Sequence, residues 1–151
     1  MKVIDNFRGE FFFLSNFYPC KMTILGLEFK TSEAAYQAMK ACDMSDACLI
    51  AAELTPGGAK KRGNTIEIRP DWDDIKLDVM DFVLRMKFKN KALREKLVAT
   101  DNAMLIEGNT WGDIVWGQVD GVGKNYLGKL LMRLRQEFIE EDAIGQRELG
   151  A

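Results

Sequence analysis

The segment from Thr31 to Cys42 constrains the fold of this chain most, because it predicts a helix that is almost entirely apolar. At about 100° per residue, Glu33, Gln37 and Lys40 point in nearly one direction, and Ala, Tyr and Met fill the positions between them. A surface helix has the opposite pattern, a narrow apolar stripe on a polar cylinder. The segment is therefore typical of a buried helix whose polar stripe lines a pocket. The alternative is that this stripe forms the solvated edge of a core helix.

The regions around this helix predict a small antiparallel sheet followed by further helices. Three apolar segments indicate strands at 11–14, 21–25 and 28–30. Helices are expected from a cap at Thr31 or Ser32, after Ser45, from Asp71 or Asp73, from about Asn90 and from Asn125. The remaining segments are a loop or short helix at 59–64, a strand at 104–106 and an irregular glycine-rich stretch at 108–123. Periodicity predicts buried side chains on the last three helices: Ile75, Val79, Phe82, Val83, Met86, Leu93, Leu97, Leu127, Leu130, Leu131, Leu134 and Phe138.

The composition is that of an ordinary globular chain with its own hydrophobic core. Its 151 residues are 47% hydrophobic, and a chain of this length buries roughly two thirds of its unfolded surface. The 21 Lys and Arg residues against 23 Asp and Glu argue against tight nonspecific binding to a nucleic-acid duplex. No apolar run approaches the ~20 residues of a membrane span, and residues 1–6 lack the features of a signal peptide. We therefore expect a cytoplasmic protein that does not bind membranes.

The chain has no histidine, which removes the commonest general base and most zinc sites. Three cysteines without a CxxC spacing predict reduced thiols, and no metal site is expected. Partial burial of Lys40 would lower the pKa of its amine and make it a nucleophile toward an electrophilic carbon. The carboxylate of Glu33, two turns away, can move protons or stabilise a developing cation. This pair is the best acid and base machinery that the sequence offers.

Two further segments have side chains suited to a phosphate or a base. The glycine-rich stretch from Gly108 to Gly123 runs into a helix N-terminus, where free amides can hold a phosphate. Within it, Trp111 suits stacking on a base or filling the core, and Asp113 is more typical of a turn than of a catalyst. The basic residues 60–62 beside glycines suit a phosphate clamp or an exposed surface.

With these residues assembled, the sequence resembles the NADAR/YbiA-like family. The matching segments appear in family order and span about residues 7 to 135. They are Phe7-Arg8-Gly9, the 14–19 loop, Ser32-Glu33, Tyr36-Gln37, Lys40, Ala59-Lys60, Trp72, Met80, Lys87-Phe88, the 97–100 stretch, Trp111-Gly112-Asp113, the 123–128 stretch, Leu131-Met132, Arg133 and Arg135. Each match is weak alone, and the ordered set is specific.

The resemblance implies a fold of the α+β class: a single, mainly helical domain with a small N-terminal antiparallel sheet. The domain would cover residues 1–141, and residues 142–151 would form a frayed polar tail. It also implies an N-glycosidase that needs no cofactor and hydrolyses the bond between ribose C1 and a base-type nitrogen. The implied substrates are ribosylaminopyrimidine phosphates of riboflavin synthesis, or ADP-ribose attached to guanine, free or in a nucleic acid.

By the same resemblance, Lys40 would attack ribose C1 to form a Schiff base, with Glu33 as the neighbouring acid and base. Asp113 and Trp72 occupy the positions of an acidic and an aromatic active-site residue in the family. Asn16 and Asn125 would fix the sugar or phosphate. The remaining expected substrate-binding residues are Tyr18, Gln37, Lys60, Trp111 and Gly123.

Two other functions fit the sequence. A noncatalytic module that binds ADP-ribose or another nucleotide sugar would keep the tryptophans and the phosphate loop, but would not need Glu33 and Lys40 together. A purely structural interaction domain would use the glycine-rich stretch for docking, but it leaves the polar stripe unexplained.

Overall fold

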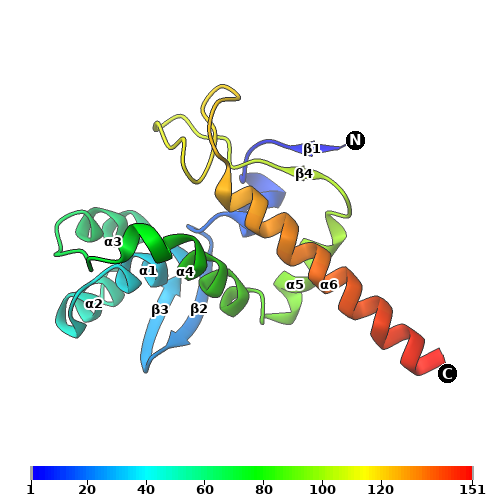
Figure 1. The fold of residues 1–151 in the computed structure, drawn as a ribbon, viewed down its shortest axis with the longest axis horizontal. Coiled ribbons are helices and arrows are strands. Elements are labelled where there is room, and N and C mark those ends of the chain that lie inside the picture. Colours follow the sequence, from blue (N-terminus) through cyan, green and yellow to red (C-terminus); the bar gives the residue numbers. More distant parts are fainter. Residues whose placement is uncertain (1, 151) are drawn as a thin grey trace. The chain divides into compact units, whose positions relative to one another are not determined.

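The computed structural model describes residues 2–150 and divides them into two compact units (Figure 1). Residues 15–87 form what we call the central unit, and residues 2–14 with 88–150 form the terminal unit. Most elements are helices and the sheets are small, so the predicted mainly helical α+β class is confirmed.

The central unit begins with the predicted antiparallel hairpin, formed by β2 (Pro19–Ile24) and β3 (Leu27–Thr31). Alternate side chains are buried, as a sheet with one face on the core requires: Met22, Ile24 and Phe29. The expected strand at 11–14 is wrong, because Gly9–Leu14 form a 3-10 helix, η1, in the terminal unit. The adjacent residues Phe13 and Leu14 are both buried there, which an extended strand with a single buried face does not allow.

Three short helices follow the hairpin, and each begins at a side-chain cap. They are α1 (Ser32–Met39), α2 (Met44–Ala51) and α3 (Pro56–Gly63). The caps are Thr31, Asp43 and Thr55, whose side-chain oxygens each accept an amide hydrogen from three residues later. Thr31 was predicted as a cap. Helix α2 instead begins one residue before Ser45, and the stretch at 59–64 belongs largely to α3.

The long helix α4 (Trp72–Lys87) has a buried face that differs from the predicted stripe. Val79 and Val83 are buried as expected, but Phe82 is 43% exposed and Met86 is half-buried. The observed face is formed by Trp72, Val79, Met80, Val83, Leu84 and Lys87. The helix is therefore rotated about its axis toward a face that includes a lysine.

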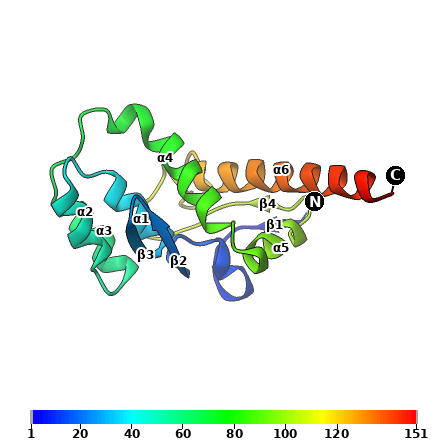
Figure 2. The ribbon, with the colours of Figure 1, turned by 90° about the horizontal axis from the view of Figure 1, so that it is seen from below.

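The terminal unit joins the two ends of the chain. Its strands β1 (Val3–Ile4) and β4 (Met104–Leu105) pair in parallel, and its helices are α5 (Lys91–Ala99) and α6 (Tyr126–Gly150). Figure 2 shows α6 beside β4 and α5. All predicted apolar residues of α5 and α6 are buried: Leu93, Leu97, Leu127, Leu130, Leu131, Leu134 and Phe138.

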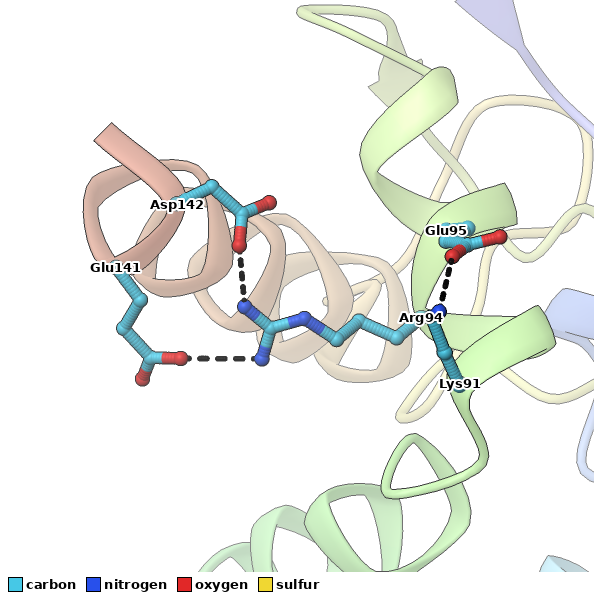
Figure 3. A network of polar contacts seen from close by, with 5 residues as sticks. All are labelled: Lys91, Arg94, Glu95, Glu141 and Asp142. Atoms are coloured by element: carbon cyan, nitrogen blue, oxygen red, sulfur yellow. Dashed lines mark hydrogen bonds and ion pairs between the residues drawn. The ribbon is translucent and has the colours of Figure 1, made fainter. Parts of the chain in front are cut away.

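The expected frayed tail from residue 142 differs from the structure, in which α6 continues to Gly150. Residues 142–149 contain no proline and several good helix formers. Arg94 of α5 also holds this region, since its Nη1 and Nη2 lie 3.0 and 2.7 Å from carboxylate oxygens of Glu141 and Asp142 (Figure 3). The same guanidinium lies 4.1 Å from the centre of the Phe138 ring. None of the helices described is both long and apolar enough to cross a lipid bilayer.

Candidate functional site

The polar stripe of α1 is buried in the structure. Glu33, Gln37 and Lys40 have only 8%, 6% and 7% of their surface exposed. The alternative of a solvated helix edge is therefore wrong, because such an edge would leave these side chains in water. Burying polar groups costs free energy unless they find hydrogen-bond partners.

Asn16 positions Glu33 at the start of α1. Its backbone carbonyl accepts the Glu33 amide hydrogen at 3.0 Å, and its Oδ1 accepts the Ser32 hydroxyl at 2.8 Å. Its Nδ2 donates to the sulfur of Met80 at 3.5 Å. The polar groups of Asn16 are thus used within the protein, which points to a role in building the site instead of the predicted contact with sugar or phosphate.

Gln37 links Glu33 to helix α3. Its Nε2 donates to Oε1 of Glu33 at 3.0 Å, while its own Oε1 is buried and has no hydrogen-bond partner among residues 2–150. Gly63 of α3 lies so close that a Cβ there would be 2.1 Å from this Oε1. An orphaned buried carbonyl oxygen is uncommon, and it leaves one acceptor for a donor supplied by a ligand.

Lys40 sits at the C-terminal end of α1, where the helix dipole favours a cation. Its amide donates to the Gln37 carbonyl at 3.2 Å, and its own carbonyl accepts the Arg69 amide at 3.0 Å. Burial lowers the pKa of the Lys40 amine, and the nearby charge of Glu33 opposes this effect. Within the described residues no hydrogen bond or ion pair engages its Nζ. The backbone of Lys40 is thus fixed by hydrogen bonds, while its amine is available to react with a substrate.

The remaining predicted residues of the central unit lie on α4, on α3 and in the turn before β2. The Trp72 ring of α4 packs on Tyr36 of α1, with centroids 5.1 Å apart and an interplanar angle of 54°, and both rings are buried. Half-buried Tyr18 precedes β2, and half-buried Lys60 lies in the last turn of α3. In the same turn, Arg62 pairs with Glu53, so its charge is already engaged within the protein.

In the terminal unit, Asp113 has the turn-forming role that its residue type favours. Its Oδ1 accepts the amide hydrogens of Val115 and Trp116 at 3.1 and 2.9 Å. The side chain of Asn109 holds the same turn through the backbone N–H and C=O of Asp113. A catalytic role for Asp113 stays a prediction from the family resemblance.

The glycine-rich stretch does not leave a free helix N-terminus for a phosphate. The amides of residues 124–127 all donate to carbonyls of residues 114–117, at distances of 2.7 to 3.2 Å. Gly123 has a φ of 147° and lies against Gly117, whose carbonyl oxygen would be 2.3 Å from an added Cβ. The loop therefore packs on the start of α6, and its glycines permit this close backbone approach.

Asn125 is also committed to the backbone. It is buried, its Oδ1 accepts the Glu107 amide at 3.0 Å, and its Nδ2 donates to the Leu105 carbonyl at 2.9 Å. These contacts tie α6 to β4, so the Asn125 side chain has a structural role. Trp111, by contrast, is 56% exposed, which excludes the core-filling alternative.

The terminal unit has a cavity of about 570 Å³, lined in part by Val3 of β1, Arg8, residues 108–110, Gln118, Asp120 and Gly121. None of the four predicted residues of this unit lines it: Trp111, Asp113, Gly123 and Asn125. Across residues 2–150, no three His, Cys, Asp or Glu side chains converge as metal ligands.

Sequence reasoning missed Lys87, which is fully buried at the end of α4. Its Nζ donates to the Ser15 carbonyl at 2.8 Å, and burial lowers its pKa to about 7. The signal was present, since Lys87 follows Met80, Val83 and Leu84 at helical spacing on one face. Spacing alone does not show its burial, because a lysine at the end of an apolar stripe normally extends its amine into water.

The chain belongs to the NADAR domain family, whose model matches residues 6–139. It is 37% identical over 137 residues to the N-glycosidase YbiA of Escherichia coli, covering 88% of this chain and 83% of that protein. The NMR structure of the Escherichia coli protein YbiA matches with a TM-score of 0.82 and 35% identity, over 95% of this chain and 89% of that one.

A riboflavin biosynthesis protein of Vibrio vulnificus is 39% identical over 132 residues, which are 85% of this chain. This chain spans only 36% of the length of that protein. The likeness therefore concerns one part of the longer relative.

Proposed function

We propose that this protein is an N-glycosidase, a hydrolase that cleaves the bond between ribose C1 and a base-type nitrogen. The observation that carries the proposal is the buried amine of Lys40 beside the buried carboxylate of Glu33 on one helix. The names of its relatives support the reaction class, and the riboflavin biosynthesis relative favours a ribosylaminopyrimidine phosphate as substrate. A noncatalytic binding module would have no need of an amine with a lowered pKa.

The proposed reaction starts with the neutral amine of Lys40. Its nitrogen bonds to C1, the C1–N bond to the base breaks with its electron pair, and the leaving nitrogen takes a proton from Glu33. The Lys40 nitrogen then loses a proton as the sugar ring opens to the C1 imine, and the ring oxygen is protonated. Water adds to C1, and collapse of the adduct releases the aldehyde form of the sugar and the free amine. The sum is hydrolysis, one water for one base released.

The electrostatics of the site fit both the attack of the amine on C1 and the departure of the base. Desolvation favours the neutral amine, so a larger fraction of Lys40 is nucleophilic at neutral pH than for an exposed lysine. Once Glu33 has given its proton to the leaving nitrogen, it is a carboxylate that stabilises the positive charge of the C1 imine intermediate, and it takes a proton back when water adds to C1. The amide of Gln37 donates to Glu33 and helps to hold its carboxylate in place.

The test combines base release with borohydride trapping. The protein is incubated separately with the ribosylaminopyrimidine phosphate and with an ADP-ribosylated guanine oligonucleotide, and the released base is quantified. Lys40→Arg should reduce release to background, because arginine stays protonated and cannot act as the nucleophile. Glu33→Gln should slow release about 10²- to 10⁴-fold.

The matched control is Lys91→Arg, because the side chain of Lys91 is 90% exposed. It should behave as the parent, and borohydride should trap a sugar on the peptide that contains Lys40 only when that lysine is present. Normal turnover by Lys40→Arg would exclude the covalent mechanism. Binding of ADP-ribose without release of base, unchanged by Lys40→Arg, would show a noncatalytic module instead.

A further inference from the structure

A buried cation holds the turn that precedes β2. Lys87 has no exposed surface, and its Nζ donates to the carbonyl oxygen of Ser15 at 2.8 Å. The same oxygen accepts the amide hydrogen of Tyr18 at 3.1 Å, and the Lys87 ammonium lies 5.8 Å from the centre of the Tyr18 ring. The end of α4 therefore fixes both ends of the Ser15–Tyr18 turn.

The Ser15–Tyr18 turn also holds the start of α1. Asn16 accepts the amide hydrogen of Glu33 on its carbonyl at 3.0 Å and the hydroxyl of Ser32 on its Oδ1 at 2.8 Å. Its Nδ2 contacts the sulfur of Met80, two turns before Lys87 on α4. Helix α4 thus holds the turn at two points, and the turn holds the backbone of Glu33.

We infer that Lys87 is a positioning residue for Glu33, which it keeps in place through the Ser15–Tyr18 turn without touching the substrate. The inference rests on the proposed function, in which Glu33 supplies the acid and base. A charged hydrogen bond to a carbonyl in a dry site is stronger than one in water, so the contact restrains the turn.

The burial of the Lys87 amine costs free energy and needs a compensating contact. An ammonium without exposed surface is costly, and burial lowers the pKa of Lys87 to about 7. Among the titratable groups that face it are the Cys20 thiol of β2, which favours the ammonium, and the phenol of Tyr18. An apolar side chain of similar length would fill the same space without this cost, but it would leave Ser15 without its charged donor.

The first experiment needs no substitution of Lys87. The full chain with Lys40→Met, which removes the other amine with a lowered pKa, is labelled with ¹⁵N and titrated across the pKa of Lys87, about 7. The amide resonances of Asn16 and Glu33 should shift with the midpoint of Lys87. Amide resonances of Asn16 and Glu33 that do not change around this midpoint would overturn the inference.

The second experiment compares Lys87→Met with Lys89→Met, an exposed lysine two residues later. In Lys87→Met the amide exchange of Glu33 should accelerate about tenfold while that of Leu97 in α5 stays unchanged, and kcat should fall about 10- to 100-fold at constant KM. Lys89→Met should match the parent. Equal acceleration at Glu33 and Leu97 with a lower Tm would show general destabilisation and overturn the inference.

The two proposals fail in different ways. The NMR measurements require no substrate, so coupling of Lys87 to Glu33 in a protein that releases no base would refute the proposed function alone. Turnover of the parent with an unchanged kcat in Lys87→Met would refute the positioning role alone.

Discussion

At the residue scale, two lysines of the central unit are buried, and the consequences of burial differ. Lys40 keeps its amine free of hydrogen bonds among residues 2–150, so the loss of water makes it a better nucleophile. The Lys87 amine donates a hydrogen bond to the backbone carbonyl of Ser15 and has a structural role. Burial lowers the pKa of both lysines. The contacts of each amine then decide whether the lysine is available as a nucleophile or is held by the protein.

Lys87 should make the stability of the protein depend on pH. Below about pH 7, both the folded and the unfolded states hold its proton, so its contribution is constant. Between that value and about 10.4, where an exposed lysine titrates, the unfolded state holds the proton and the folded state does not. Stability therefore rises with pH, by up to about 1.4 kcal/mol per pH unit, relative to Lys87→Met.

Urea unfolding of the parent and of Lys87→Met at three pH values in this window measures the difference. Groups that do not interact with Lys87 titrate equally in both proteins and cancel, and Cys20→Ala in both proteins removes the thiol whose pKa depends on Lys87. Free energies of unfolding that change in parallel for the two proteins would contradict the pKa of about 7.

At the element scale, the contact of α3 with α1 depends on Gly63. An added Cβ would lie 2.1 Å from Oε1 of Gln37, so Gly63→Ala should push this side chain away from Glu33. We expect a loss of stability of about 1–3 kcal/mol and a fall in kcat/KM of about tenfold or more.

The matched control for this substitution is Gly57→Ala in the same helix, where nothing lies within 4 Å of an added Cβ. It should keep the activity of the parent and its stability or a little more. Steady-state kinetics and thermal unfolding compare the two variants. Equal activity in both would show that the position of Gln37 does not matter for turnover.

Helix α6 provides a second matched pair of glycines. A Cβ at Gly128 would lie 2.1 Å from the Leu105 carbonyl oxygen, whereas one at Gly145 meets nothing within 4 Å. Gly128→Ala should therefore cost about 1–3 kcal/mol by forcing α6 away from β4. Gly145→Ala should gain up to about 1 kcal/mol through helix propensity. Urea unfolding of both variants measures whether the free energy of unfolding falls in Gly128→Ala and rises in Gly145→Ala. Equal changes in this free energy would contradict the close packing of α6 on β4.

At the scale of the whole molecule, the end of α6 should contribute little beyond its anchor to α5. Ile144 and Leu149 are 52% and 90% exposed, so deletion of residues 144–151 should change the free energy of unfolding by less than about 0.5 kcal/mol. Deletion from residue 141 onward also removes both carboxylates that bind Arg94 (Figure 3) and should cost about 1 kcal/mol more at low salt. Thermal unfolding at two salt concentrations separates these cases, and equal losses would contradict the anchor.

The division into two units was not predictable from local sequence patterns. The terminal unit is built from both ends of the chain, and its parallel strands β1 and β4 pair residues about a hundred positions apart. Two-residue strands carry no periodicity of their own. Such pairing is decided by tertiary contacts, and the same holds for the burial of adjacent residues in η1.

The sequence by itself determined the family, the order of the helices, the hairpin and the polar stripe of α1, because these follow from motifs, caps and periodicity within short segments. Only the tertiary structure decided that the stripe is buried, that Asn16 and Asn125 serve the backbone, and that α4 turns a lysine inward. These outcomes depend on which distant groups fill the hydrogen bonds and the space around a residue, and no local pattern encodes that competition.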